Sequence, residues 1–153
     1  MSDTPPVGLG VSLRQAWVGY RRQLEHELAA AGFGDRGFPD GRVLRLCTGG
    51  SEVTISQIGR ELGITRQGAS KIVASLRDRG YVALSPSPTD RREKIVKPTP
   101  RALQFLAAQR VAARRIEARV HAELGDGALD ALYQLLDALG TADQSRATDH
   151  LRV

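Results

Sequence analysis

The chain has little of several residue types that define particular protein classes. Its single cysteine, Cys47, excludes an intramolecular disulfide, and no run approaches the ~18 consecutive apolar residues of a membrane span. The N-terminal residues lack the basic start and long apolar segment of a secretory signal peptide. Aromatic residues make up only 5% of the chain, which favours helices over a β-sandwich. We therefore expect a soluble, cytoplasmic, mainly helical protein with no membrane partner and a single domain, residues 1–153.

Lysine is also scarce, since only three of the 22 basic residues are lysine. Against 17 acidic residues, the formal net charge is +5. Residues 60–97 contain nine basic and four acidic residues, so this window carries the whole surplus. A localised basic field attracts a polyanion, and nucleic acid is the default candidate. On charge alone, a solvated basic surface is an equally good interpretation.

No residue pattern typical of an enzyme is present. The sequence shows no nucleophile with a base, no phosphate-binding loop and no paired catalytic carboxylates, so we expect neither catalysis nor a cofactor. His26, His121 and His150 have no cysteine or carboxylate cluster at metal-ligand spacing, which predicts no metal site. Cys47 lies in a short apolar segment, where a buried, inert thiol is favoured over a redox switch.

The apolar periodicity predicts a succession of helices. Glycines at positions 32, 63, 80 and 125 mark the ends of four of them, and Thr99 with Pro100 is a typical helix start. Residues 32–42 are rich in glycine and form a loop. The predicted helices span residues 11–32, 43–47, 54–62, 65–79, 100–124 and 128–139, and residues 81–84 and 94–97 form a β-hairpin.

The first and last helices carry apolar stripes that have no evident partner within the chain. The last helix is especially rich in leucine, too much so for a surface that faces water. We therefore expect a homodimer in which helices within residues 11–32 and 100–140 form the interface. Residues 141–153 are polar and are expected to form a flexible tail.

The strongest local pattern is ISQIGRELGITRQGASKIVASL, residues 55–76. It predicts two helices crossing at the small residue Gly59, a left-handed turn at Gly63, and Ile64 filling the corner between them. This spacing is typical of a DNA-binding helix-turn-helix, whose second helix enters the major groove. An ordinary helical hairpin with a solvated polar face is the alternative.

The second helix of this pair has one apolar and one polar side. An arginine or lysine can donate to guanine, an amide suits adenine, and a hydroxyl suits either base. The residues predicted to read the major groove are Arg66, Gln67, Ser70 and Lys71. The residues predicted to contact phosphates are Thr54, Ser56 and Thr65.

The hairpin that follows has a basic tip. A winged helix-turn-helix places such a hairpin beside the recognition helix, where basic residues reach the neighbouring minor groove. We expect Asp90, Arg91, Arg92 and Lys94 to form this DNA-binding wing, within a DNA-binding lobe of residues 41–98. Asp90 is expected to hold the guanidinium of Arg92 by a charge-assisted hydrogen bond. A solvated turn with scattered charge is the alternative.

The run VTISQIGRELGITRQGASKIVASLRDRGYV, followed by Asp90-Arg91-Arg92 and KIVKPTPRA, resembles the MarR family of bacterial transcription regulators. The resemblance covers about a third of the chain. It implies a homodimeric winged helix-turn-helix with recognition helices in successive major grooves of a pseudo-palindrome, ~34 Å apart. It matches Asp90 and Arg92 to the family's wing-tip pair, with Arg92 as the minor-groove arm. Many members are repressors released by small aromatic or amphipathic effectors.

The sequence also departs from the family pattern. The segment GFGDRGFPDG is richer in glycine than the usual approach to the second helix, and KPTPRA replaces a more common leucine-threonine motif. Effector-binding residues are therefore not assigned. We expect a transcriptional repressor that binds double-stranded DNA in a sequence-specific manner. A winged-helix protein-interaction module and a small-molecule-binding protein without DNA-binding function are the alternatives.

Overall fold

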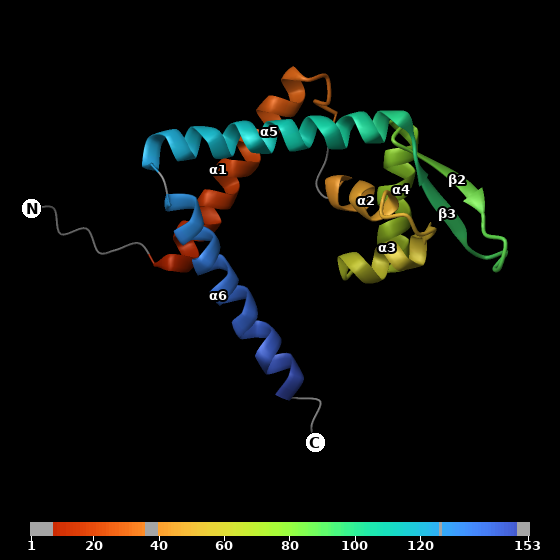
Figure 1. The fold of residues 1–153 in the computed structure, drawn as a ribbon. Coiled ribbons are helices and arrows are strands. Elements are labelled where there is room, and N and C mark those ends of the chain that lie inside the picture. The colour runs from red at the N-terminus through yellow and green to blue at the C-terminus, as the bar shows by residue number, and fades with distance from the viewer. Residues whose placement is uncertain (1–7, 36–39, 126, 150–153) are drawn as a thin grey trace, which may run out of the picture. The chain divides into compact units, whose positions relative to one another are not determined.

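The computed structural model describes residues 8–35, 40–125 and 127–149, with side chains described as far as residue 140. Figure 1 shows its helices and its small sheet. In chain order the elements are α1 (Leu9–Ala30), α2 (Asp40–Cys47), β1 (Val53–Thr54), α3 (Ile55–Leu62), α4 (Arg66–Asp78), β2 (Val82–Pro86), β3 (Lys94–Pro98), α5 (Pro100–Leu124) and α6 (Ala128–Asp149). The predicted mainly helical fold class is confirmed.

The chain divides into two compact units, residues 1–113 and 114–153, with the boundary inside α5. The single domain expected from length stays a prediction. None of the helices in the described ranges offers the length of apolar sequence that a bilayer crossing requires.

The core of the first unit combines buried side chains from the helices α1 to α5 and the strands β2 and β3. Phe105 of α5 packs edge to face with Phe33 and Tyr81 at centroid distances of 5.7 and 5.8 Å. Each fully buried side chain of this size stabilises the fold by about 1.5–3 kcal/mol. The start of α5 is thereby packed into the same core as the helix-turn-helix. Other fully buried members are Leu28, Val43, Leu44, Ile58, Val73, Leu76 and Val96.

The turn between α3 and α4 forms largely as the glycines predict. Gly63 has φ +66°, the left-handed conformation that glycine adopts without strain. A Cβ on Gly59 would lie 3.1 Å from the carbonyl oxygen of Ile64, so the two helices approach closely at this residue. The role expected for Ile64 is wrong, because its side chain is 39% exposed and does not fill the corner. A Cβ on Gly59 would also lie 3.6 Å from the Cβ of Ala69, so Gly59 and Ala69 bring α3 and α4 together directly.

The wing belongs to a three-stranded antiparallel sheet with the order β1-β3-β2, rather than to an isolated hairpin. β2 pairs with β3 over five residues, from Val82 opposite Pro98 to Pro86 opposite Lys94. β1 adds two residues, with Val53 opposite Val96. Two residues are too few for an alternating pattern to be recognised in the sequence.

Two helix boundaries differ from the prediction. α2 begins at Asp40 rather than residue 43, and its Gly41 lies against the side chain of Gln109, where a Cβ would come within 2.8 Å. α6 continues to Asp149 instead of ending at Leu139, since no proline follows and Gly140 is accommodated within the helix. The tail predicted for residues 141–153 is therefore helical as far as Asp149, and residues 150–153 lie outside the described residues.

Candidate nucleic-acid interface

α4 presents a polar face to solvent and an apolar face to the core. The hydroxyl of Thr65 accepts a hydrogen bond from the backbone N–H of Gly68 at 3.0 Å and so caps the helix. Ala69, Val73 and Leu76 are fully buried, which leaves the opposite face exposed. The predicted division into two faces is confirmed. The exposed face carries Arg66, Gln67, Ser70 and Lys71, whose contacts with bases stay predictions.

The three hydroxyl residues predicted to contact phosphates differ in their present partners. Thr54 and Thr65 use their oxygens as helix-capping acceptors, so each hydroxyl hydrogen can still be donated to a phosphate. Ser56 instead donates its hydrogen to Glu93 Oε1 at 2.6 Å. A phosphate contact by Ser56 would therefore require this bond to break.

The wing tip is held by backbone hydrogen bonds. Asp90 Oδ1 accepts from the backbone N–H of Arg92 at 2.8 Å, and the N–H of Glu93 donates to the carbonyl of Asp90 at 3.0 Å. The prediction that Asp90 binds the guanidinium of Arg92 is wrong. The carboxylate instead accepts from the backbone of Arg92 and closes the turn. The side chains of Arg91, Arg92 and Lys94 are exposed.

A cavity of about 220 Å³ lies between α4 and the wing. Ser70 and Val73 line it from α4, and Leu84 lines it from the sheet. Four cationic side chains surround it, so a negatively charged group is favoured there. These cations are Arg66, Arg77, Arg92 and Lys94.

Arg77 was not among the predicted site residues. It follows Ser70 by seven residues, two helical turns along the same exposed face of α4. That periodicity is the signal that could have found it. Its guanidinium bonds the carboxylate of the adjacent Asp78 at 2.9 Å, and both side chains are more than half exposed.

Comparison with known proteins shows which family this geometry resembles. A profile of the MarR family matches residues 37–93, the segment that contains the helix-turn-helix and the wing. The structure resembles the transcriptional repressor CouR bound to a 23-mer DNA duplex, at 28% identity over 87% of this chain and 92% of that chain, with a TM-score of 0.70. The helix-turn-helix and wing of this chain are therefore similar to those of the MarR family.

More distant relatives share the same fold. The reduced form of MarR from E. coli is 18% identical over 89% of this chain and 98% of that chain, with a TM-score of 0.74. YusO from Bacillus subtilis is 14% identical over 88% and 93%, with a TM-score of 0.69. None of the curated proteins matches this chain. The MarR family consists of transcription regulators rather than enzymes.

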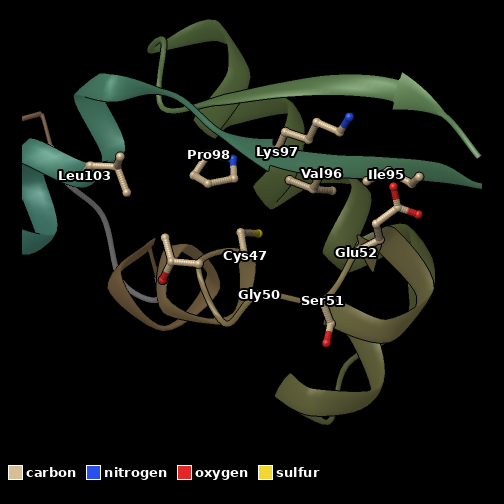
Figure 2. Close-up of a pocket in the computed structure, with 10 residues that line it drawn as sticks. Cys47, Gly50, Ser51, Glu52, Ile95, Val96, Lys97, Pro98 and Leu103 are labelled. Atoms are coloured by element: carbon tan, nitrogen blue, oxygen red, sulfur yellow. The ribbon is translucent and has the colours of Figure 1, made fainter.

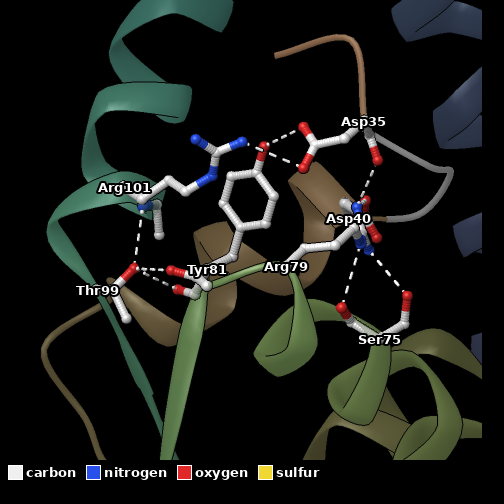
Figure 3. Close-up of polar contacts among 9 residues, drawn as sticks. Asp35, Asp40, Ser75, Arg79, Tyr81, Thr99 and Arg101 are labelled. Carbon is white, nitrogen blue, oxygen red and sulfur yellow. Dashed lines mark hydrogen bonds and ion pairs between the residues drawn. The ribbon is translucent and has the colours of Figure 1, made fainter. Parts of the chain in front are cut away.

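A polar network holds the C-terminal end of α4 (Figure 3). Arg79 donates to Asp40 Oδ2 at 2.7 Å and to the carbonyl of Asp35 at 2.8 Å. Tyr81 donates its hydroxyl hydrogen to Asp35 Oδ1 at 2.7 Å, and Arg101 of α5 stacks on the Tyr81 ring at 4.8 Å. The network therefore ties the recognition helix to the segment before α2 and to the start of α5.

The same contacts change the titration of two groups. Burial raises the pKa of Tyr81 to about 12, and the hydrogen bond to Asp35 acts in the same direction. Partial burial acts to raise the pKa of Asp35, but the hydrogen bonds from Tyr81 and Arg101 together outweigh it and hold that pKa below its ordinary value. The phenol therefore stays neutral and the carboxylate charged at neutral pH.

A cavity of about 350 Å³ lies between the end of α2, the segment that follows it, and β3 (Figure 2). Ile95, Val96 and Pro98 line it from the strand, and Cys47 lines it from α2. Burial raises the pKa of the Cys47 thiol to about 11, so the thiol is protonated and unreactive at neutral pH. Among the described residues, no three His, Cys, Asp or Glu side chains gather where they could hold a metal ion.

A second cavity, of about 400 Å³, lies between α1, α2 and α5 of the first unit. Trp17 and Tyr20 of α1 line it and stack on one another at 6.1 Å between ring centroids. Arg45 of α2 and Arg110 of α5 add two cations, and Arg45 donates to Gln109 Oε1 at 2.9 Å. The cavity thus combines aromatic surface with positive charge.

Proposed function

We propose that this protein is a sequence-specific transcriptional regulator, a repressor, that binds a pseudo-palindromic operator in double-stranded DNA as a homodimer. The exposed polar face of α4 beside the basic wing carries the proposal. Gln67, Ser70 and Lys71 have the donors and acceptors that reading base edges requires. The relative CouR is a repressor seen with DNA, which supports the same activity here. DNA binding in turn implies a cytoplasmic location in a bacterial cell.

The wing and the cavity beside it account for the affinity in this proposal. Arg91, Arg92 and Lys94 are exposed on the wing, and Arg77 extends the basic surface along α4. Cations at these positions neutralise phosphates and release counterions, which supplies most of the sequence-independent binding free energy. We assign the DNA-binding lobe to residues 41–98.

Dimerisation is proposed through helices within residues 11–32 and 100–140. α1 exposes Trp17 at 52% and Val18 at 47%, and α6 exposes further apolar residues of its own. Large apolar surfaces of this kind are covered by a partner in stable proteins. The exposed apolar residues of α6 are Leu132, Tyr133, Leu135, Leu136 and Leu139.

Release by a small effector is the regulatory part of the proposal. The cavity lined by Trp17, Tyr20, Arg45 and Arg110 has the size and the mixed apolar and cationic surface that a small aromatic or amphipathic compound requires. Because α1 and α5 belong to the proposed dimer region, a ligand there could alter the spacing of the two recognition helices.

The test is the salt dependence of DNA binding. A duplex selected by the full-length protein from a random-sequence pool is labelled, and its affinity is measured by fluorescence anisotropy between 50 and 200 mM salt. A protein that neutralises six or more phosphates loses ~10³-fold in affinity over this range. Weak binding without salt dependence would contradict the proposal and favour a protein-interaction module.

A further inference from the structure

The guanidinium of Arg66 is already occupied by the protein, although its position at the start of α4 suggests a base contact. Its Nε donates to Ser56 Oγ at 3.0 Å, and its Nη2 donates to the backbone carbonyl of Arg92 at 2.9 Å. The same Nε lies 3.5 Å from Glu93 Oε1. These partners lie on α3 and on the wing, so one side chain joins three parts of the DNA-binding lobe.

Glu93 makes this junction costly to disrupt. Its side chain is 20% exposed, and Oε1 accepts the hydrogen of Ser56 at 2.6 Å. Its other oxygen, Oε2, is buried and has no hydrogen-bond partner among the described residues. A largely buried carboxylate requires a compensating charge, and the Arg66 guanidinium is the cation beside it.

The junction also determines where the wing-tip arginine lies. The carbonyl of Arg92 accepts from Arg66, and the N–H of Arg92 donates to Asp90 Oδ1. Both peptide groups that flank the Arg92 side chain are therefore fixed, one of them directly to α4. The side chain itself remains exposed.

We propose that Arg66 is a positioning residue, acting with Ser56 and Glu93 to fix the wing at a set angle to α4. A forked guanine contact needs two N–H groups of one edge of the guanidinium. Nε and Nη2 of Arg66 form one such edge, and both point to protein acceptors, which leaves only the Nη1–Nη2 edge, in an orientation fixed by these bonds. Base reading by α4 then depends on Gln67, Ser70 and Lys71, and Arg66 acts on DNA through Arg92. This inference rests on the proposed function.

The test compares Glu93→Gln, Arg66→Ala and the double variant in the full-length protein on the duplex selected by the wild type. Removing a negative charge near DNA should by itself strengthen binding. We expect the opposite: Glu93→Gln weakens binding about 3- to 10-fold, Arg66→Ala weakens it similarly, and the double variant is no weaker than the weaker-binding single variant, because both changes break one junction.

A matched control is Glu61→Gln, which makes the same charge change at an exposed position of α3. It should leave binding unchanged or slightly stronger. Arg92→Ala should weaken the wild type more than it weakens the Glu93→Gln variant, because part of the Arg92 contribution is already lost there. If Arg66→Ala does not fold, as judged by circular dichroism, the same comparison of single and double variants is made with Ser56→Ala and Glu93→Gln.

A base-reading Arg66 would give a different result. Arg66→Ala would then relax specificity at one base pair per half-site, Glu93→Gln would behave like Glu61→Gln, and the two effects would add. That outcome overturns the inference and leaves the proposed function intact. Failure of the wild type to bind DNA in a salt-dependent manner would instead overturn the proposed function.

Discussion

Arg79 and Asp40 form a largely buried ion pair. Arg79 Nη1 lies 2.7 Å from Asp40 Oδ2, and the two side chains are 21% and 6% exposed. Arg79 also donates to the carbonyl and the hydroxyl of Ser75, so it holds the last turn of α4 while binding the first turn of α2. The pair thus sets where the recognition helix ends relative to the rest of the lobe.

We expect Asp40→Ala to lower the free energy of unfolding by about 3 kcal/mol, because it leaves the Arg79 charge unpaired in a mostly buried position. The matched control is Asp78→Ala, which removes the exposed partner of Arg77 and should change stability by about 0–1 kcal/mol. Urea unfolding followed by circular dichroism measures both. Equal effects of the two substitutions would show that Arg79 has sufficient alternative partners.

Tyr81 predicts a loss of stability in alkaline solution. An unfolded tyrosine ionises near pH 10, whereas the pKa of Tyr81 in the folded protein is about 12. The unfolded state therefore releases its proton first, and the free energy of unfolding falls as the pH rises from 10 toward 12. Tyr81→Phe should be less stable at about pH 8, through loss of the bond to Asp35, but its stability should fall less above pH 10.

Cys47 is expected to react slowly in the folded protein. A pKa of about 11 instead of 9.0 lowers the thiolate fraction about 100-fold near neutral pH, and burial adds a steric barrier. Alkylation by iodoacetamide, followed by mass spectrometry, should be at least that much slower in the native protein than in urea. Rapid alkylation of the native protein would instead indicate an accessible thiolate and would support a redox role for Cys47.

Lys71→Ala and Arg92→Ala should each weaken operator binding by ~1–3 kcal/mol, since one removes a predicted base contact and the other the predicted minor-groove arm. The two differ in character: Lys71→Ala should relax specificity in the major groove, and Arg92→Ala should reduce the salt dependence as well. Fluorescence anisotropy on the selected duplex and on single base-pair variants separates these effects. Unchanged affinity in both variants would contradict the assignment of this surface to DNA.

The leucines of α6 predict a dimer that one charge can disrupt. Leu136→Glu places a carboxylate on the exposed apolar surface, where burial of an unpaired charge costs several kcal/mol. We expect the dimer dissociation constant to rise at least ~100-fold, measured by light scattering after size-exclusion chromatography. Gln134→Glu, on the same helix, adds the same charge at an exposed polar position and should leave the dimer intact. A monomeric wild type would exclude the homodimer.

Much of the helix-turn-helix could be predicted from the sequence. The left-handed turn at Gly63, the cap at Thr65 and the exposed face of α4 follow from the backbone preferences of single residues and from a period of 3.6 residues. The extra strand β1 was missed because two residues carry no period. The end of α6 was misplaced because no strong breaker marks it.

The sequence by itself determined the order of the helices and of the wing hairpin, the basic segment and the residues that α4 exposes, because these depend on interactions between residues a few positions apart. Only the tertiary structure decided the partners of the charged side chains. Arg66 bonds the carbonyl of Arg92, 26 residues away, and Arg79 bonds Asp40, 39 residues away. Contacts between residues so far apart in the sequence depend on how the helices and the sheet pack. A side chain that the local pattern assigns to DNA can therefore be held by the protein instead.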